Sequence, residues 1–123
     1  MRDHRTLRAF DLADEIALMT YKITKQFPRE EIYGLVSQMR RAAVSVPSNI
    51  VEGCSRESRT EYLRFLEIAF GSLRELNYQA SLATRPNYLG SPEVEVYSEK
   101  IEEAENVLSA LIRAVRHHEP LNP

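Results

Sequence analysis

The placement of glycine and proline is the feature of this sequence that most constrains its fold. The 123-residue chain has only four glycines and six prolines, and the breaks fall at Pro28, at Gly53 and between Pro86 and Pro92. Because both residue types interrupt regular helices, these positions divide the chain into four long segments. Apolar residues recur every three or four positions in each segment, which is the period of an amphipathic α-helix. The sequence therefore predicts an all-α protein with four helices.

The first two helices are separated by Phe27-Pro28. The first runs from about Leu7 to Gln26, because a residue that precedes proline avoids helical backbone angles. The second begins just after Pro28 and stops near Gly53. It contains Pro47, which removes a backbone hydrogen bond and clashes with the preceding turn, so we expect one helix with a kink near Pro47.

The last two helices carry recognisable start signals. The third opens with a capping box from Ser58 to Glu61 and ends at Arg85-Pro86. The fourth has Ser91 as its N-cap and Pro92 at its first position. Four long helices with short connections favour an antiparallel, up-down-up-down four-helix bundle. We expect residues 1–119 to form this single domain and residues 120–123 to form a short C-terminal tail.

The apolar surface exceeds what one bundle can bury. The second, third and fourth helices each have one core stripe. The stripe of the second contains Ile32, Leu35, Val36, Met39, Ala43, Val46, Ile50 and Cys54, and that of the third contains Tyr62, Phe65, Leu66, Ala69, Leu73, Leu76, Ala80 and Ala83. The stripe of the fourth contains Tyr97, Ile101, Ala104, Leu108, Leu111 and Val115. The first helix has two apolar faces, one with Leu7, Phe10, Ala13, Ala17 and Tyr21 and one with Leu12, Ile16, Met19 and Ile23. Outside the stripes lie Tyr33, Val44, Val51, Ile68, Tyr78 and Leu82. Monomers rarely expose such strips, so the sequence predicts a homo-oligomer.

Composition narrows the classes of protein to consider. The formal charge is −2, which argues against a generally basic nucleic-acid binder. The single cysteine, Cys54, cannot form an internal disulfide and suits a reducing compartment. No apolar run approaches the length of a membrane span, and acidic residues interrupt any signal-peptide core near the N-terminus. We therefore expect a cytoplasmic protein without membrane contact.

Three runs in the second and third helices carry a family resemblance. They are FPREEIYGL at 27–35, SQMRRAAVSVPSNIVEG at 37–53 and EYLRFLEIAFGSLREL at 61–76. The chain resembles the bacterial four-helix bundle family named for proteins encoded in intervening sequences of 23S rRNA genes. Val51 stands where that family usually has alanine. The resemblance implies a ring-like homopentamer, and it implies kinship with the accessory protein of diversity-generating retroelements, which works beside a reverse transcriptase and binds nucleic acid.

A polar line follows one flank of the second helix, with Gln38, Ser45, Asn49 and Glu52. One interpretation makes it a ligand or partner site. The alternative is structural: Asn49 and Glu52 would hydrogen-bond around the proline, where a backbone carbonyl loses its donor, or would bond across a subunit interface. We favour the structural interpretation, because polar groups beside a proline usually satisfy the backbone.

Five arginines are candidate phosphate contacts for weak nucleic-acid binding, namely Arg40, Arg41, Arg56, Arg59 and Arg64. Across residues 40–64 they stand against three glutamates, which gives +5 − 3 = +2. Such a small excess is also what a solvated, partly ion-paired surface would show.

No motif points to catalysis, a metal or a cofactor. Inward Glu-x-x-His pairs of a di-metal bundle are missing, and so are a phosphate-binding loop and a nucleophile elbow. Arg113 and His118 form an Arg-x4-His pattern found in some small helical ribonucleases, but five residues on a helix separate the two side chains by about 140°. The sequence thus favours a non-enzymatic, self-assembling scaffold or adapter, with a possible link to a ribonucleoprotein. The alternative is a small ribonuclease that uses Arg113 and His118.

Overall fold

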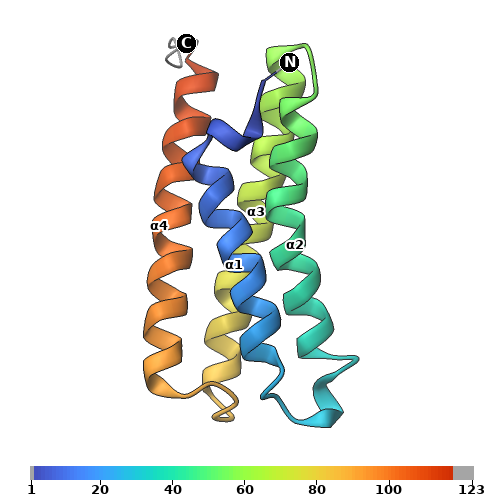
Figure 1. Cartoon of the computed structure of the whole chain (residues 1–123), viewed down its shortest axis with the longest axis vertical. Helices are drawn as coiled ribbons and strands as arrows, with labels where there is room; N and C mark the ends of the chain where they lie inside the picture. The colour runs from blue at the N-terminus through green and yellow to red at the C-terminus, as the bar shows by residue number, and fades with distance from the viewer. Residues whose placement is uncertain (1, 118–123) are drawn as a thin grey trace.

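Four long helices run alternately up and down, as the computed structural model shows for residues 2–117 (Figure 1). The bounds are α1 (Arg8–Thr24), α2 (Leu35–Cys54), α3 (Arg59–Thr84) and α4 (Ser91–Arg116), with short 3₁₀ turns η1 (His4–Thr6) and η2 (Arg29–Glu31). Helices α1 and α3 each pack against both α2 and α4. Residues 2–117 contain no strand. The antiparallel four-helix bundle is therefore confirmed, and the predicted tail at 120–123 lies outside the described residues.

The predicted stripes on α2, α3 and α4 form most of the core. Tyr62, Leu73 and Ile101 are among the largest side chains that are almost completely buried. Of the two apolar faces of α1, the one with Leu12, Ile16 and Ile23 lies against the core, together with Ala9 and Ala13. The sequence placed two further residues in these stripes, but Tyr21 and Ile32 are 44% and 47% exposed. Those two side chains therefore lie on the outside of the bundle.

Helix α2 begins later than its sequence suggests. Pro28 has an extended backbone with ψ 148°, the η2 turn follows, and the α-helix starts only at Leu35. The Glu31 carboxylate accepts a hydrogen bond from the Leu35 backbone N–H at 3.1 Å and so caps the first turn. It also accepts one from the Tyr88 hydroxyl at 3.0 Å, which ties it to the α3–α4 connection. The expectation of a helix starting just after Pro28 is wrong, because this side-chain cap holds a separate turn there.

The other helix boundaries are close to those expected. The Ser58 hydroxyl accepts a hydrogen bond from the Glu61 backbone N–H at 3.0 Å, which confirms Ser58 as the N-cap of α3. At α4 the N-cap is Gly90, one residue before the expected Ser91. Helix α2 continues through Pro47 to Cys54, and the kink expected at Pro47 stays a prediction.

Gly53 lies at a close contact between α2 and α3. A Cβ added at this position would come within 2.9 Å of the Phe65 Cβ, which is closer than two carbon atoms can pack. The sequence suggested that Gly53 stops the helix, but the residue lies inside α2, one position before its end. Its role is to permit close packing of the two helices.

The N-terminal segment closes the α2–α3 end of the bundle (Figure 1). The Arg2 backbone N–H donates to the Cys54 carbonyl at 3.1 Å, and the Arg2 side chain donates to the Arg56 carbonyl at 2.8 Å. The Arg2 guanidinium also lies 4.0 Å from the centre of the Tyr62 ring. These contacts cover the buried Cys54 and Tyr62 side chains and satisfy carbonyls at the C-terminus of α2.

Candidate interaction surface

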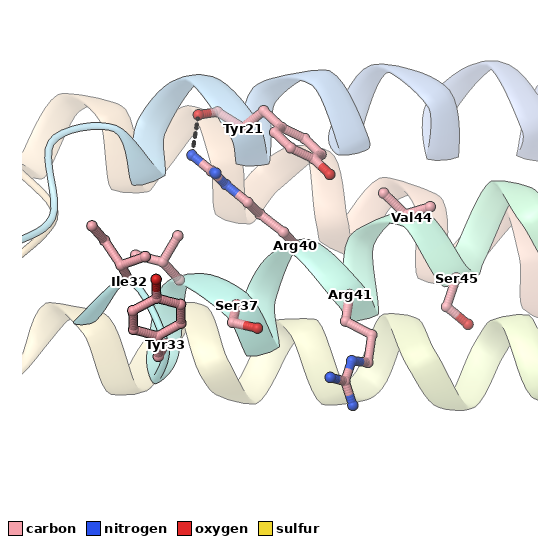
Figure 2. Close-up of a pocket in the computed structure, with 9 residues that line it drawn as sticks. Tyr21, Ile32, Tyr33, Ser37, Arg40, Arg41, Val44 and Ser45 are labelled. Atoms are coloured by element: carbon pink, nitrogen blue, oxygen red, sulfur yellow. Dashed lines mark hydrogen bonds between the residues drawn. The ribbon is translucent and has the colours of Figure 1, made fainter. Parts of the chain in front are cut away.

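An open groove of about 660 Å³ runs along the outside of α1 and α2 (Figure 2). We call it the α1–α2 groove. It exists because α2 begins only at Leu35, so the preceding turn leaves two large side chains outside the core. The lining residues are Tyr21 from α1, Ile32 and Tyr33 from the connection, and Val36, Ser37, Arg40, Arg41, Val44 and Ser45 from α2.

Apolar side chains dominate the walls of this groove. Tyr33 is 95% exposed, and Ile32, Tyr21 and Val44 are 47%, 44% and 39% exposed. Val36 is buried beneath them. Large apolar groups that cluster at one place on a surface, and are not scattered singly, are typical of interaction sites. The groove thus has the apolar character of an interaction site.

The two neighbouring arginines of the groove differ in their surroundings. Arg40 reaches across to α1, where its Nε donates to Thr24 Oγ1 at 2.9 Å and its Nη2 approaches the Tyr21 carbonyl at 3.4 Å. Its guanidinium also lies 4.7 Å from the centre of the Tyr21 ring. Arg41 points away from α1, and no residue in the described part of the chain pairs with it (Figure 2). Arg40 therefore holds α1 and α2 together, whereas the Arg41 charge is available to a partner.

The four residues of the polar line do not form one site. The Asn49 side-chain amide donates to the Ser45 carbonyl at 2.8 Å and to Ser45 Oγ at 3.0 Å. The Ser45 hydroxyl lies 2.8 Å from the Ser72 hydroxyl on α3, which connects the two helices. Glu52 pairs with Arg56 at 2.8 Å on the surface. Gln38 lines a separate hollow of about 400 Å³ beside Tyr88 and Leu82.

The five candidate phosphate-binding arginines fall into two groups. Arg40 and Arg41 lie in the groove, and the other three lie near the α2–α3 connection, beyond the far end of α2. At 1.5 Å per residue, about 20 Å of helix separates Arg41 from Cys54. Arg56 pairs with Glu52, Arg64 pairs with Glu61 at 3.4 Å, and Arg59 is exposed at the start of α3. The structure thus does not bring the five arginines together into one basic surface.

The residues considered for chemistry are also far from the groove. Cys54 is buried at the end of α2, and burial raises the pKa of its thiol, so the thiol stays protonated and weakly nucleophilic at neutral pH. Arg113 donates to the Ser109 hydroxyl at 2.9 Å, and its proposed partner His118 lies outside the described residues. Residues 2–117 contain no cluster of three or more His, Cys, Asp or Glu side chains suited to a metal ion.

Sequence reasoning missed Tyr21 and Ile32 as parts of this surface. Both fit the helical period of a core stripe, and periodicity alone cannot tell which apolar face of a helix points inward. The position of Ile32 soon after Pro28, in a segment rich in charged residues, was the available signal that it lies outside regular helix.

Both the sequence and the fold are similar to those of known proteins. The sequence model described as "23S rRNA-intervening sequence protein" matches residues 5–110. The fold is similar to a crystal structure of a protein of unknown function from the S23 ribosomal protein family of Bacteroides thetaiotaomicron. The two chains are 24% identical with a TM-score of 0.79, over 85% of this chain and 98% of the other. No curated protein matches the sequence. Within residues 2–117, no helix has the length and hydropathy needed to cross a membrane.

Proposed function

The chain belongs to the 23S rRNA-intervening sequence protein family, and we propose that it is a non-enzymatic scaffold that assembles from several copies of itself. The observation that carries this proposal is the apolar surface of α1, α2 and the connection between them, where Leu18, Tyr21, Tyr33, Val44 and Val51 are all exposed. Burial of roughly 100 Å² of apolar surface contributes about 2.5 kcal/mol. Several such side chains together offset the cost of association, which is at least about 4 kcal/mol.

Three titratable side chains are buried in the core. Burial raises the pKa values of Cys54, Tyr62 and Tyr97, so all three are neutral at physiological pH. They lie in the core, away from the α1–α2 groove, which is lined by apolar side chains and two arginines. A reduced, buried Cys54 also suits the cytoplasmic location that we propose.

We further propose a closed ring, with five copies as the family resemblance implies. Such a ring would act as an adapter, and association with a ribonucleoprotein is the role that the same resemblance suggests. Light scattering on a sizing column measures the assembly directly. We expect a mass several times that of the 14.2 kDa chain at micromolar concentration, and the mass of a single chain would overturn the proposal.

The interface also has a direct test. Tyr33→Asp combined with Val44→Asp should reduce the measured mass, because both changes place charge in the groove. Thr60→Asp combined with Ser81→Asp is a matched control, since both side chains are exposed on α3, outside the groove. Incubation with RNA tests for the ribonuclease alternative. Cleavage by the wild type that is lost in His118→Ala would refute a non-enzymatic role.

A further inference from the structure

We infer that the α1–α2 groove of one copy receives the outer face of α4 from a second copy, with Val96 at the centre of the contact. This inference rests on the self-assembly proposed above and adds which two surfaces meet. The exposed walls of the groove are apolar, and the Arg41 charge beside them lacks a partner within residues 2–117. The complementary surface must therefore combine an apolar side chain with unpaired carboxylates.

The outer face of α4 has this combination. Val96 is 56% exposed and lines a hollow of about 480 Å³ between α1 and α4, which Lys22 and Ile23 of α1 also line. Glu99, three residues further along the helix, is its neighbour on the surface of α4. Glu95, Glu99 and Glu102 are exposed, and no residue of the described chain pairs with them. Three other α4 glutamates are already engaged: Glu93 with Gln26, Glu103 with Arg8 and Glu105 with Arg74. The free negative charge of α4 thus lies along one side of its exposed valine.

The two surfaces also lie at the same level of the bundle. The groove occupies the first half of α2, and Val96 lies in the second turn of α4. Both helices begin at the end where the α1–α2 and α3–α4 connections lie, and α2 and α4 lie on opposite sides of α1 (Figure 1). Two copies that contact each other through α2 of one and α4 of the other can therefore lie side by side, with no displacement along the bundle axis.

This arrangement has a consequence for the assembly. The contact joins two different surfaces, so each copy keeps one free groove and one free α4 face until the chain of copies closes. Without a step along the axis, the rotation between neighbours generates a ring and not a helical filament. A contact that paired two grooves with each other would give only a dimer.

Charge exchange tests the inference. Arg41→Glu or Glu99→Lys alone should reduce the mass measured by light scattering toward that of one chain, since each change brings like charges together at every interface. The combination Arg41→Glu/Glu99→Lys should restore the wild-type mass. The control Arg41→Glu/Glu57→Lys has the same net charge, but Glu57 is exposed in the α2–α3 connection at the opposite end, so it should not restore assembly. Circular dichroism of each variant checks that it remains helical.

Crosslinking gives a second readout. Val44→Cys mixed with Val96→Cys should form crosslinked dimers with a short bismaleimide, whereas either variant alone should not, and wild type with its buried Cys54 sets the background.

A monomeric wild type would refute the proposed self-assembly. An oligomeric wild type whose mass is unchanged by both single charge reversals would refute this inference alone. Self-crosslinking of Val44→Cys would show grooves facing each other. Loss of RNA binding by Arg41→Glu at unchanged mass would assign the groove to nucleic acid. Either result overturns the inference.

Discussion

The Tyr97 hydroxyl lies 2.6 Å from Thr20 Oγ1 in the centre of the bundle, where it joins the last helix to the first. Both side chains are completely buried. Thr20 has one hydroxyl proton, which it donates to the Ile16 carbonyl at 2.8 Å, so Tyr97 is the donor in the pair. Helices α1 and α4 are thereby held in one register by a directional bond inside an apolar core.

This direction predicts unequal effects of the two deletions. Tyr97→Phe removes the donor and leaves Thr20 bonded to Ile16, so we expect a loss of about 1 kcal/mol in the free energy of unfolding. Thr20→Val leaves the Tyr97 hydroxyl buried without a partner and should cost more, about 1–3 kcal/mol. Urea denaturation measures both. The double variant should be close to Tyr97→Phe alone, and strictly additive losses would contradict the assigned direction.

Buried tyrosines make stability depend on alkaline pH. Burial raises the pKa of Tyr62 to about 12 and raises that of Tyr97 as well, whereas an unfolded tyrosine titrates near 10. Stability is fully present below pH ~10, and it falls as pH rises toward the folded pKa, because only the unfolded chain loses these protons. The expected slope is about 1.4 kcal/mol per pH unit for each group. Tyr62→Phe should make the slope shallower, and Tyr33→Phe, whose ring is 95% exposed, should not.

Gly53 and Gly71 should respond in opposite ways to alanine. Both lie within helices, but a Cβ on Gly53 would meet Phe65, whereas a Cβ on Gly71 would meet nothing within 4 Å. Gly53→Ala should destabilise the fold by about 1–3 kcal/mol through overpacking. Gly71→Ala should stabilise it by roughly 0.5–1 kcal/mol, because alanine is the better helix former. Thermal melts of the two variants compare these effects, and an equal shift in both would refute the close approach at Gly53.

Asn49 and Glu52 should differ in their importance for stability. The Asn49 amide is partly buried and donates twice to Ser45, so Asn49→Ala should cost about 1 kcal/mol. Glu52 forms an exposed ion pair with Arg56, and Glu52→Ala should cost less than about 0.5 kcal/mol. Chemical denaturation and oligomer mass measure both. If both variants unfold and assemble like the wild type, a ligand site at Asn49 becomes the better interpretation.

Any nucleic-acid binding should be weak, independent of sequence and sensitive to salt. Arg59 and Arg64 are exposed near the α2–α3 connection, but residues 93–105 of α4 hold six glutamates and one lysine, a net charge of 1 − 6 = −5. Phosphate contacts lose affinity steeply as salt increases, and fluorescence anisotropy from low to physiological salt would show this decline. Arg64→Ala, near the α2–α3 connection, should reduce the salt dependence, whereas Arg113→Ala should not. Tight binding that persists at high salt would reveal a recognition surface of another kind.

The start of α2 could not be predicted from the adjacent residues. Pro28 is a good first residue for a helix, and nothing in the adjacent residues excludes that role. In the structure, however, the Glu31 carboxylate caps the helix at Leu35, and it also accepts a hydrogen bond from Tyr88, 57 residues along the chain. A contact at that separation leaves no periodic trace in the sequence. Ile32 and Tyr33 lie in the segment that precedes the capped first turn of α2, and both are exposed and line the groove.

Helical period and chain punctuation determined the four helices, their antiparallel order and most of the core, because burial on one face of a helix repeats every three to four residues. Tertiary structure alone decided which apolar face of α1 points inward, where Gly53 allows α2 to touch α3, and which arginine keeps an unpaired charge. The physical reason is that each of these depends on what a neighbouring helix presents at the contact. Tyr21 and Ile16 are both apolar residues at helical spacing, but only Ile16 faces the space that α2, α3 and α4 enclose.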